Sequence, residues 1–485
     1  MRTLKIRTAM FLLFAAGLNF ACERDVKLPG AIDQTLPTTT SPAPQNPGTP
    51  ETPSNPETQP NPTVAIDATA IFSDDFDSKP DWSVPYTTYD QSCNKEAGCT
   101  NYPEGYYGYY ISRSVISPLT GNGLHLDSTN HRGSSGKGLT FWDQTRGVVE
   151  WTSGMQIGVD FPAQEAVYVR YWIKMQPGYR YDKGTSTSMM RKLNHISHYL
   201  YNGKPFTFFT AGGFFPTTVN QLGFANANLA NLYNTFFIRP DPSYNGVQAN
   251  PMPNVFQGTA NSTGIRNHFD LPNDDLPIGN YSGTGTEYNS PGMLADGGWH
   301  SLEFYLRNNS APGVPNGEYK FWMDGVLQIY GAGLIYREAA SNLPKAIWNF
   351  VHVGGNLYNP FRGSGISGEQ FYAVDDLVIS THYSGPPATP VNVVASSVTP
   401  GVVHLEWEAG TNGASYLLSG YRIYYRAAQG GAKNSVRLGK NRAADISGLV
   451  SGQEYQFQVT AVNRASYDSN ENESITPLPV SVIVK

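Results

Sequence analysis

The sequence has few cysteines, few charged side chains and only one long hydrophobic run. Its 485 residues include three cysteines, and charged residues make up 15% of the chain, against roughly 25% in an average soluble protein. The hydrophobic run lies at the N-terminus, which excludes a protein with several membrane-spanning helices. The net charge is −6, whereas nucleic-acid-binding proteins usually carry a basic domain. We therefore expect no nucleic acid among the partners.

Tyrosine, glycine and proline are abundant instead. The chain contains 30 Tyr, 49 Gly and 35 Pro, and aromatic residues reach 13%. Aromatic residues favour strands, and glycine and proline favour turns. The composition therefore predicts an all-β, loop-rich protein.

The N-terminus has the features of a secretory signal. Residues 1–22 carry three basic side chains, then the apolar run Ala9–Leu18, then small residues before Cys22. Ala21-Cys22 resembles a bacterial lipobox, in which the cysteine is lipidated. Asn19 stands where that pattern has leucine, so plain signal cleavage is the alternative. We expect a lipoprotein of the bacterial cell envelope or outer surface, or otherwise a secreted protein.

The other two cysteines, Cys93 and Cys99, are six residues apart. An oxidising compartment would join them in a disulfide. Two thiols without a nearby histidine are too few ligands for a metal ion.

Residues 23–64 are predicted to be a spacer. Nine prolines lie between Pro37 and Pro62, interleaved with Thr, Ser, Asn and Gln. Such a segment has too few apolar side chains to form a core and stays extended. The lipid on Cys22 would be the only contact of the chain with a membrane.

Short alternating strands follow, from about residue 65 to 385. Val167–Lys174 and Ser301–Arg307 each place apolar side chains on one face and polar ones on the other, and Tyr319–Gly325 ends in an Asp-Gly turn. Two sheets packed face to face would bury the apolar faces in one core.

Several segments of residues 65–385 resemble, in their order, a concanavalin A-like β-jelly-roll sandwich of the kind found in laminin-G-type lectins and polysaccharide lyases. The segments are Ile71–Phe76, Gly121–Leu126, Val167–Lys174, Gly298–Phe304, Lys320–Val326 and Ala373–Ser380. This resemblance implies the fold and a carbohydrate ligand.

Residues 386–485 resemble a fibronectin type III β-sandwich. Val403–Trp407 supplies the core tryptophan of the second strand, Tyr421–Tyr425 follows, and Leu449–Asn463 contains Leu-x-x-Gly-x-x-Tyr with Tyr455 as the corner tyrosine. The chain is expected to act as a monomer.

A basic strip lies between Ala166 and Phe206. It contains seven Lys or Arg residues and one acid, Asp182. In an acidic, exported chain such a strip favours an acidic polysaccharide or cell-surface glycan as the partner.

Uronate polysaccharides are cleaved by β-elimination, which requires a group that neutralises the carboxylate, a base and an acid. We expect Arg170 and Lys192 to neutralise the carboxylate, His195 or Tyr199 to be the base, and Tyr305 to be the acid. The resemblance implies that these side chains share one face with five substrate-binding residues. Those are Trp172, Lys174, Arg307, Trp322 and His352.

Three alternatives remain open. A non-catalytic lectin-like adhesin would use the same groove, with Trp172 and Trp322 stacking on sugars. The strip could be plain solvated surface, or, in a structural envelope protein, it would be covered by a loop such as residues 211–297. The Glu-x-Asp-x-x-Glu strand of β-glucanases and the strand motifs of the best-known alginate lyases are absent from the sequence.

No cofactor or metal is expected, with Ca²⁺ as an alternative. Its ligands would be the carboxylates of Asp74, Asp75, Asp77, Asp375 and Asp376.

Overall fold

The computed structural model describes residues 70–85, 89–111, 123–144, 151–177, 189–199, 214–224, 233–239, 260–261, 264–265, 297–337, 339–358, 369–410, 418–465, 468, 470–474 and 476–485. Every regular element in these ranges is a strand, which confirms the predicted all-β class. None of the described residues belongs to a helix that could span a bilayer. The predicted signal, Cys22 and the spacer lie outside the described residues.

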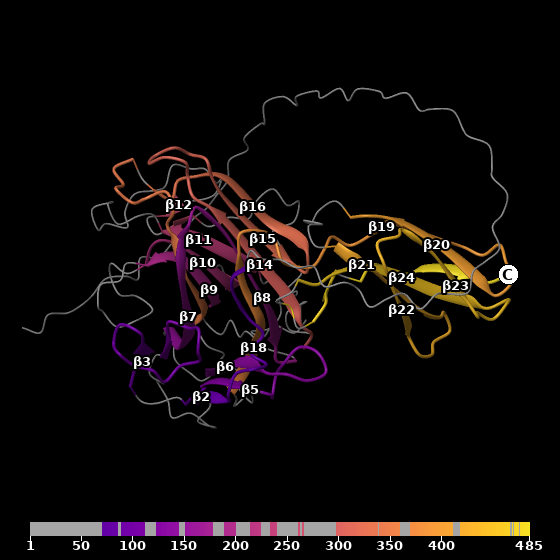
Figure 1. The fold of residues 1–485 in the computed structure, drawn as a ribbon, viewed down its shortest axis with the longest axis horizontal. Helices are drawn as coiled ribbons and strands as arrows, with labels where there is room; N and C mark the ends of the chain where they lie inside the picture. Colours follow the sequence, from indigo (N-terminus) through magenta and orange to yellow (C-terminus); the bar gives the residue numbers. More distant parts are fainter. Residues whose placement is uncertain are drawn as a thin grey trace, which may run out of the picture. The chain divides into compact units, whose positions relative to one another are not determined.

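Two large antiparallel sheets face each other in the first domain (Figure 1). Sheet 1 has the order β16-β15-β14-β8-β18-β6-β5-β2, and β1 pairs with β18. Its strands are β1 (Ala70–Asp74), β2 (Trp82–Val84), β5 (Leu124–Asp127), β6 (Gly138–Gln144), β8 (Ala166–Met175), β14 (His300–Arg307), β15 (Gly317–Met323), β16 (Val326–Leu334) and β18 (Glu369–Ser380).

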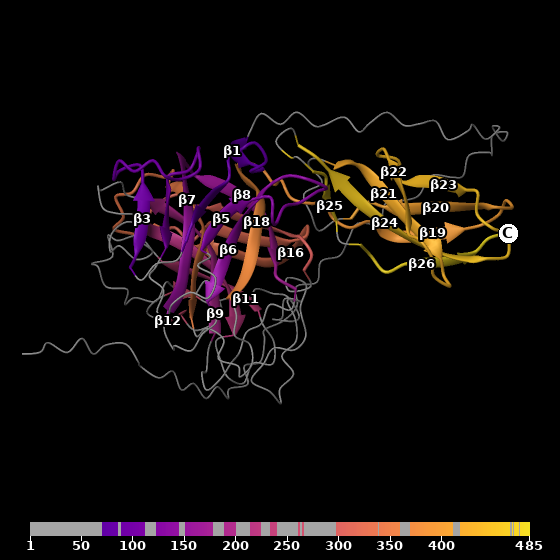
Figure 2. The same cartoon turned by 90° about the horizontal axis from the view of Figure 1, so that it is seen from below.

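Sheet 2 has the order β11-β10-β9-β17-β7-β4-β3. Figure 2 shows several of its strands from a second direction. The strands are β3 (Gln91–Asn94), β4 (Gly108–Ile111), β7 (Trp151–Gln164), β9 (Met189–Tyr199), β10 (Phe214–Phe224), β11 (Tyr233–Arg239) and β17 (Trp348–Tyr358). The short β12 (Ala260–Asn261) and β13 (Gly264–Ile265) pair only with each other.

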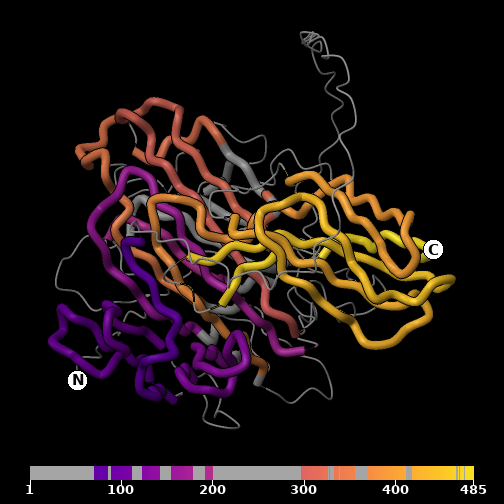
Figure 3. Tube along the Cα trace, turned by 45° about the vertical axis from the view of Figure 1, so that its right-hand side comes forward, coloured from indigo at the N-terminus to yellow at the C-terminus, as the bar shows by residue number. Residues whose placement is uncertain are grey.

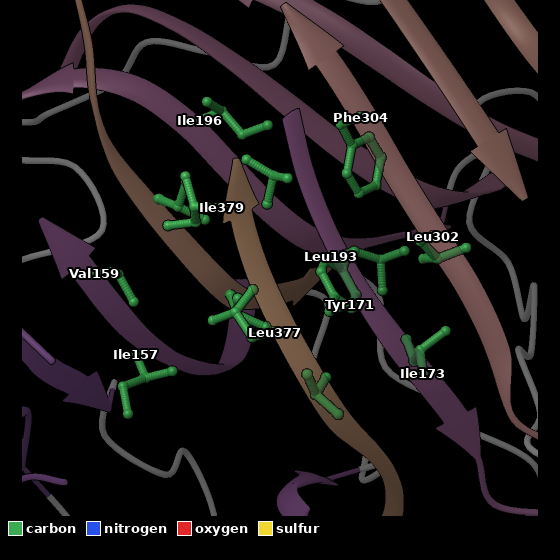
Figure 4. Packing of buried hydrophobic residues seen from close by; sticks show 14 of the residues in the cluster. Ile157, Val159, Tyr171, Ile173, Leu193, Ile196, Leu302, Phe304, Leu377 and Ile379 are labelled. Carbon is green, nitrogen blue, oxygen red and sulfur yellow. The ribbon is translucent and has the colours of Figure 1, made fainter. Parts of the chain in front are cut away.

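The core fills the space between the two sheets. Tyr171 and Phe304 of sheet 1 and Ile157 and Ile196 of sheet 2 are all fully buried. Figure 4 shows these side chains pointing toward one another from β7, β8, β9 and β14. The predicted alternation in β8 and β14 therefore has its expected cause, because every second side chain enters this core.

The C-terminal domain is a second, smaller sandwich (orange to yellow in Figure 3). One sheet has the order β19-β20-β23, and the other has the order β22-β21-β24-β25 with β26 paired to β24. The strands are β19 (Val391–Ser396), β20 (Val402–Glu408), β21 (Leu418–Ala427), β22 (Asn434–Leu438), β23 (Ala443–Ser447), β24 (Glu454–Asn463), β25 (Asn472–Glu473) and β26 (Val480–Ile483).

The core of this second sandwich contains the tryptophan expected from the sequence. Trp407 packs edge-on against Tyr421 at 5.3 Å between ring centroids. The hydroxyl of Tyr455 accepts a hydrogen bond from the backbone N–H of Val450, five residues earlier. This bond ties the chain across the corner before β24, as the sequence predicts for Tyr455.

Removing one large core side chain tests the sandwich core. Phe304 is fully buried and stacks on Phe321 at 5.0 Å. We expect Phe304→Ala to lower the free energy of unfolding by about 3–5 kcal/mol, because it removes a buried ring and leaves a cavity. Val314→Ala, at a position 38% exposed, is the control and should change it by less than about 0.5 kcal/mol. Equal effects in denaturant unfolding would contradict the assigned core.

Candidate functional site

The predicted site residues divide between two faces. Arg170, Trp172 and Lys174 lie on β8, Tyr305 and Arg307 on β14, and Trp322 on β15, all in sheet 1. Lys192, His195 and Tyr199 lie on β9 and His352 on β17, in sheet 2. Because each sheet turns its apolar face to the shared core, the two outer faces point in opposite directions. The expectation of one common face is therefore wrong.

Arg170 is fully buried on the outer face of sheet 1. Its guanidinium pairs with the carboxylate of Asp468 at 2.7 Å, and neither side chain is exposed. It also donates to the backbone oxygens of Ser384, at 3.0 Å, and Asp376, at 3.3 Å. With both terminal nitrogens of its guanidinium engaged inside the protein, Arg170 is not placed to bind a uronate in this structure.

Glu303 lies beside Arg170 in the β8–β14 register and is also fully buried. Burial raises the pKa of its carboxyl to about 8. The backbone N–H of Ser384 donates to it at 2.7 Å. The segment that follows β18 therefore covers this part of sheet 1.

The two tryptophans proposed as sugar platforms are covered as well. Trp172 is 6% exposed, the guanidinium of Arg132 lies 3.7 Å from its ring centroid, and its Nε1 donates to Asn472. Trp322 is 7% exposed and packs edge-on against Tyr383 at 5.1 Å. Neither ring offers a free face for stacking on a sugar.

The remaining predicted residues of sheet 1 lie toward its edge. Tyr305 packs against Tyr168 at 4.5 Å, and burial raises the pKa of its phenol. Arg307 donates to Glu318 at 2.7 Å, and this hydrogen bond raises the pKa of its guanidinium. Lys174 is half-buried on the same outer face.

The outer face of sheet 2 brings the other predicted residues together. His195 of β9 and His352 of β17 are register partners, and their ring centroids lie 5.6 Å apart. Both imidazoles are buried. Burial lowers the pKa of His352 to about 3, so this imidazole stays neutral at physiological pH.

Lys192 reaches the same face through a register shift. His195 and Lys192 pair with Val219 and Gln221, which are two residues apart on β10. Residues two apart on a strand share a face, so His195 and Lys192 do too. In the sequence, however, Lys192 is three positions from His195. The register shift lies between the two residues, and beside it Leu193 points into the core.

A pair of glycines on β17 separates Lys192 from Gln156. Gln156 of β7 is the register partner of Gly354, so no side chain stands between β7 and β9 at this level. A Cβ added at Gly355 would lie 2.6 Å from the Cβ of Lys192, so this position needs glycine. Lys192 and Gln156 therefore face each other across two strand spacings, about 10 Å.

Gln156 is fully buried, and neither atom of its carboxamide has a hydrogen-bond partner among the described residues. Buried polar groups are nearly always paired, so an unpaired amide calls for an explanation. Its neighbour two positions along β7 is Gly158, which is the register partner of His352. Gln156 thus lies one row of side chains from the histidine pair.

A tyrosine pair lies on the other side of the histidines. The hydroxyls of Tyr107 and Tyr199 are 2.9 Å apart, and both rings pack against Phe350. Phe350 in turn lies edge-on to His352 at 4.9 Å. Burial raises the pKa of Tyr199, so its phenol stays protonated.

Gln156 and Tyr107 were absent from the sequence prediction. Gln156 stands in the alternating run Met155–Asp160, whose core-facing positions are Met155, Ile157 and Val159. That alternation alone places Gln156 on an outer face, but nothing in the sequence shows which residues oppose it.

The acidic residues considered for Ca²⁺ have protein partners. Asp74 pairs with Lys79, and Asp376 with Arg132. Asp375 accepts from the backbone N–H of Arg132 at 2.7 Å. Over the described ranges no group of three His, Cys, Asp or Glu residues is arranged to hold a metal ion.

Cys93 and Cys99 form the predicted disulfide, with a Cα–Cα distance of 5.2 Å. It closes the loop between β3 and the segment leading to β4.

Replacing Arg170 tests the role that the structure gives it. Arg170→Met leaves the carboxylate of Asp468 buried without its partner, so we expect the free energy of unfolding to fall by about 3–5 kcal/mol. Lys174→Met, on the same strand and face, is the matched control and should cost less than about 1 kcal/mol. The measurement is denaturant unfolding, and similar midpoints for the two variants would contradict the buried role.

Burial of His352 predicts a loss of stability in acid. The unfolded chain binds a proton at this histidine below about pH 6.5, whereas the folded chain does not until about pH 3. Stability therefore falls as the pH drops through this window, by roughly 2 kcal/mol at pH 5. His352→Gln should show a correspondingly smaller fall between pH 7 and 5. Equal pH slopes in the two proteins would rule out a neutral buried His352.

Comparison with known proteins identifies the second domain. Residues 386–477 match the family model of the fibronectin type III domain. The solution structure of the fn3 domain of human contactin 1 is 18% identical, covers 25% of this chain and 92% of its own, and has a TM-score of 0.18.

The chain is also similar to the structure of alginate lyase Aly36B. That structure is 12% identical, covers 61% of this chain and 98% of its own, and has a TM-score of 0.28. No curated protein matches the chain. The family match confirms the sequence prediction for the C-terminal part: the smaller sandwich is a fibronectin type III domain.

Proposed function

We propose that this protein is an exported polysaccharide lyase that cleaves an acidic, uronate-containing polymer by β-elimination on the outer face of sheet 2. The observation that carries the proposal is the carboxamide of Gln156, which is buried and unpaired among the described residues and faces Lys192 across the glycine pair. Export, the lipid anchor and an acidic polysaccharide as the substrate class are expectations from the sequence.

The first requirement of β-elimination is to neutralise the sugar carboxylate. Without this, the proton at C5 is too weakly acidic to be removed, and the enolate that forms is too unstable. Lys192 of β9 and Gln156 of β7 flank the glycine pair of β17 from its two sides. In the proposal, a carboxylate bound between them accepts a hydrogen bond from each.

The second requirement is a base for the C5 proton. His195 lies one row from Lys192 and Gln156 and beside His352. Because His352 remains neutral, it adds no positive charge that would lower the basicity of His195. His195 therefore accepts the proton in the proposed mechanism.

The third requirement is an acid for the departing oxygen. When the C5 proton leaves, the C5 electrons form the C4–C5 double bond, the C4–O bond breaks, and the oxygen must gain a proton. The Tyr107–Tyr199 pair shares a hydrogen bond on the far side of the histidines. The raised pKa of Tyr199 keeps its phenol protonated, so a proton is available for this step.

This assignment replaces two earlier expectations. Arg170 and Tyr305 lie in sheet 1, so in the proposal Gln156 takes the role expected of Arg170, and the tyrosine pair takes that of Tyr305. The adhesin alternative loses the support of Trp172 and Trp322, whose rings are covered.

Ultraviolet absorbance of the unsaturated uronide product tests the proposal. The purified protein would be incubated with alginate, glucuronan, ulvan, hyaluronan, chondroitin and pectate. We expect one polymer to be cleaved, with the rate reduced roughly 10²- to 10⁴-fold in His195→Ala and at least tenfold in Gln156→Ala. Tyr305→Phe, on the opposite sheet, is the matched control and should keep its rate.

Loss of activity in Tyr305→Phe but not in His195→Ala would move the chemistry to sheet 1. Binding of one polymer without any product would instead favour the adhesin.

A further inference from the structure

The solvent face of the fibronectin type III domain contains a small polar pocket. It lies over β21 and β24, has a volume of about 220 Å³, and is lined by Tyr424, Tyr425, Arg426, Lys433, Gln456, Gln458 and Pro479. Drug-sized ligands usually occupy pockets of roughly 300–1,000 Å³. A pocket of this size suits one unit of a chain that continues beyond it.

The strand register explains why these side chains meet. Tyr424 pairs with Gln458, and Arg426 pairs with Gln456, so the four side chains alternate to the face opposite the core. Their neighbours Ile423 and Phe457 point into the core. The sheet therefore places the ring of Tyr424, the guanidinium of Arg426 and the amides of both glutamines side by side.

The two cations at this pocket differ from the others on the same sheet. Arg422 and Arg437 are engaged in ion pairs with Glu471 and Glu473. Within the described residues, neither Arg426 nor Lys433 has a carboxylate at ion-pair distance, and no acidic side chain lines the pocket. Arg426 donates to the carboxamide of Gln456 at 3.4 Å, and neither charge is neutralised by a carboxylate in the part of the chain that the structure describes.

The remaining lining groups suit a sugar. The ring of Tyr424 is partly exposed, with the ammonium of Lys433 3.9 Å from its centroid. An exposed cation–π contact of this kind is weak, about 0.5–1 kcal/mol, so a ligand can displace it. The oxygen of the Gln456 amide accepts from Arg426 at 3.4 Å, and the nitrogen of the Gln458 amide donates to the backbone oxygen of Pro477 at 2.7 Å. The N–H₂ of Gln456 and the oxygen of Gln458 are the donor and the acceptor offered to sugar hydroxyls.

We propose that this pocket is a second binding site for the acidic polysaccharide, holding one uronate unit with Arg426 and Lys433 on its carboxylate and Tyr424 against its ring. The choice of a uronate rests on the proposed function, whereas the pocket and its two cations, which form no ion pair among the described residues, do not. In this arrangement the second domain retains the polymer while the first domain cleaves it.

Affinity electrophoresis of the purified full-length protein tests the site, with alginate or pectate in the gel and neutral dextran as the blank. We expect polyuronate to retard the protein and Arg426→Ala/Lys433→Ala to weaken the apparent affinity roughly threefold to thirtyfold, as for two exposed charge contacts. Tyr424→Ala should weaken it without changing the charge. Lys440→Ala/Arg442→Ala, which removes two exposed charges elsewhere on the domain, is the matched control and should bind like the unaltered protein.

Two results would overturn the proposal. One is equal retardation of the pocket variant and the unaltered protein, and the other is equal weakening in the control variant. Equal retention by a single-stranded oligonucleotide would likewise reduce the pocket to a non-specific polyanion surface.

The test is separate from that of the lyase. Retardation that depends on Arg426 and Lys433 in a protein that releases no unsaturated product would support this site and refute the proposed function. Cleavage of a polymer, with retardation that does not depend on Arg426 and Lys433, would support the proposed function and refute this site.

Discussion

Burial of alternate side chains from two sheets in one core is the constraint that sets the rest of this structure. Because β8 and β9 belong to different sheets, the polar side chains between their core residues must point to opposite sides of the sandwich. A single basic strip in the sequence therefore supplies two separate surfaces. Arg170 and Lys192 are close in the chain, but they cannot act on one sugar while both sheets keep their cores.

The two surfaces use their charges in different ways. On sheet 1, Arg170 is enclosed with Asp468 and Glu303. A charge that is buried and paired in this way stabilises the interior of the protein and does not attract a polymer to its surface. Removing charges from water is costly unless each is paired and hydrogen-bonded. On sheet 2, Gln156 is buried with its amide unpaired among the described residues. The first surface holds Arg170 in an internal ion pair, whereas the proposed function places a ligand on the second.

Much of the fold could be predicted from the sequence, and much less of the site. The alternation of Val167–Lys174, the disulfide and the corner role of Tyr455 depend on neighbours close in the chain, and the structure contains all three. The site depends on which strands pair. The shift beside Leu193, which returns Lys192 to the outer face, exists only in the pairing of β9 with β10. Local sequence carries no information on that pairing.

The glycine pair of β17 links fold and proposed chemistry. Glycine in the middle of a strand weakens it, because it has no side chain to pack and loses more entropy on ordering, and it often marks close approach of another chain or a ligand. Gly355 has a structural reason, since a Cβ would collide with Lys192. Gly354 has a positive φ of 94°, and a Cβ there would collide with the backbone oxygen of Met155 and lie 2.7 Å from the ring of Phe141. Packing therefore accounts for both glycines, and the proposed chemistry uses the absence of side chains that they leave between Lys192 and Gln156.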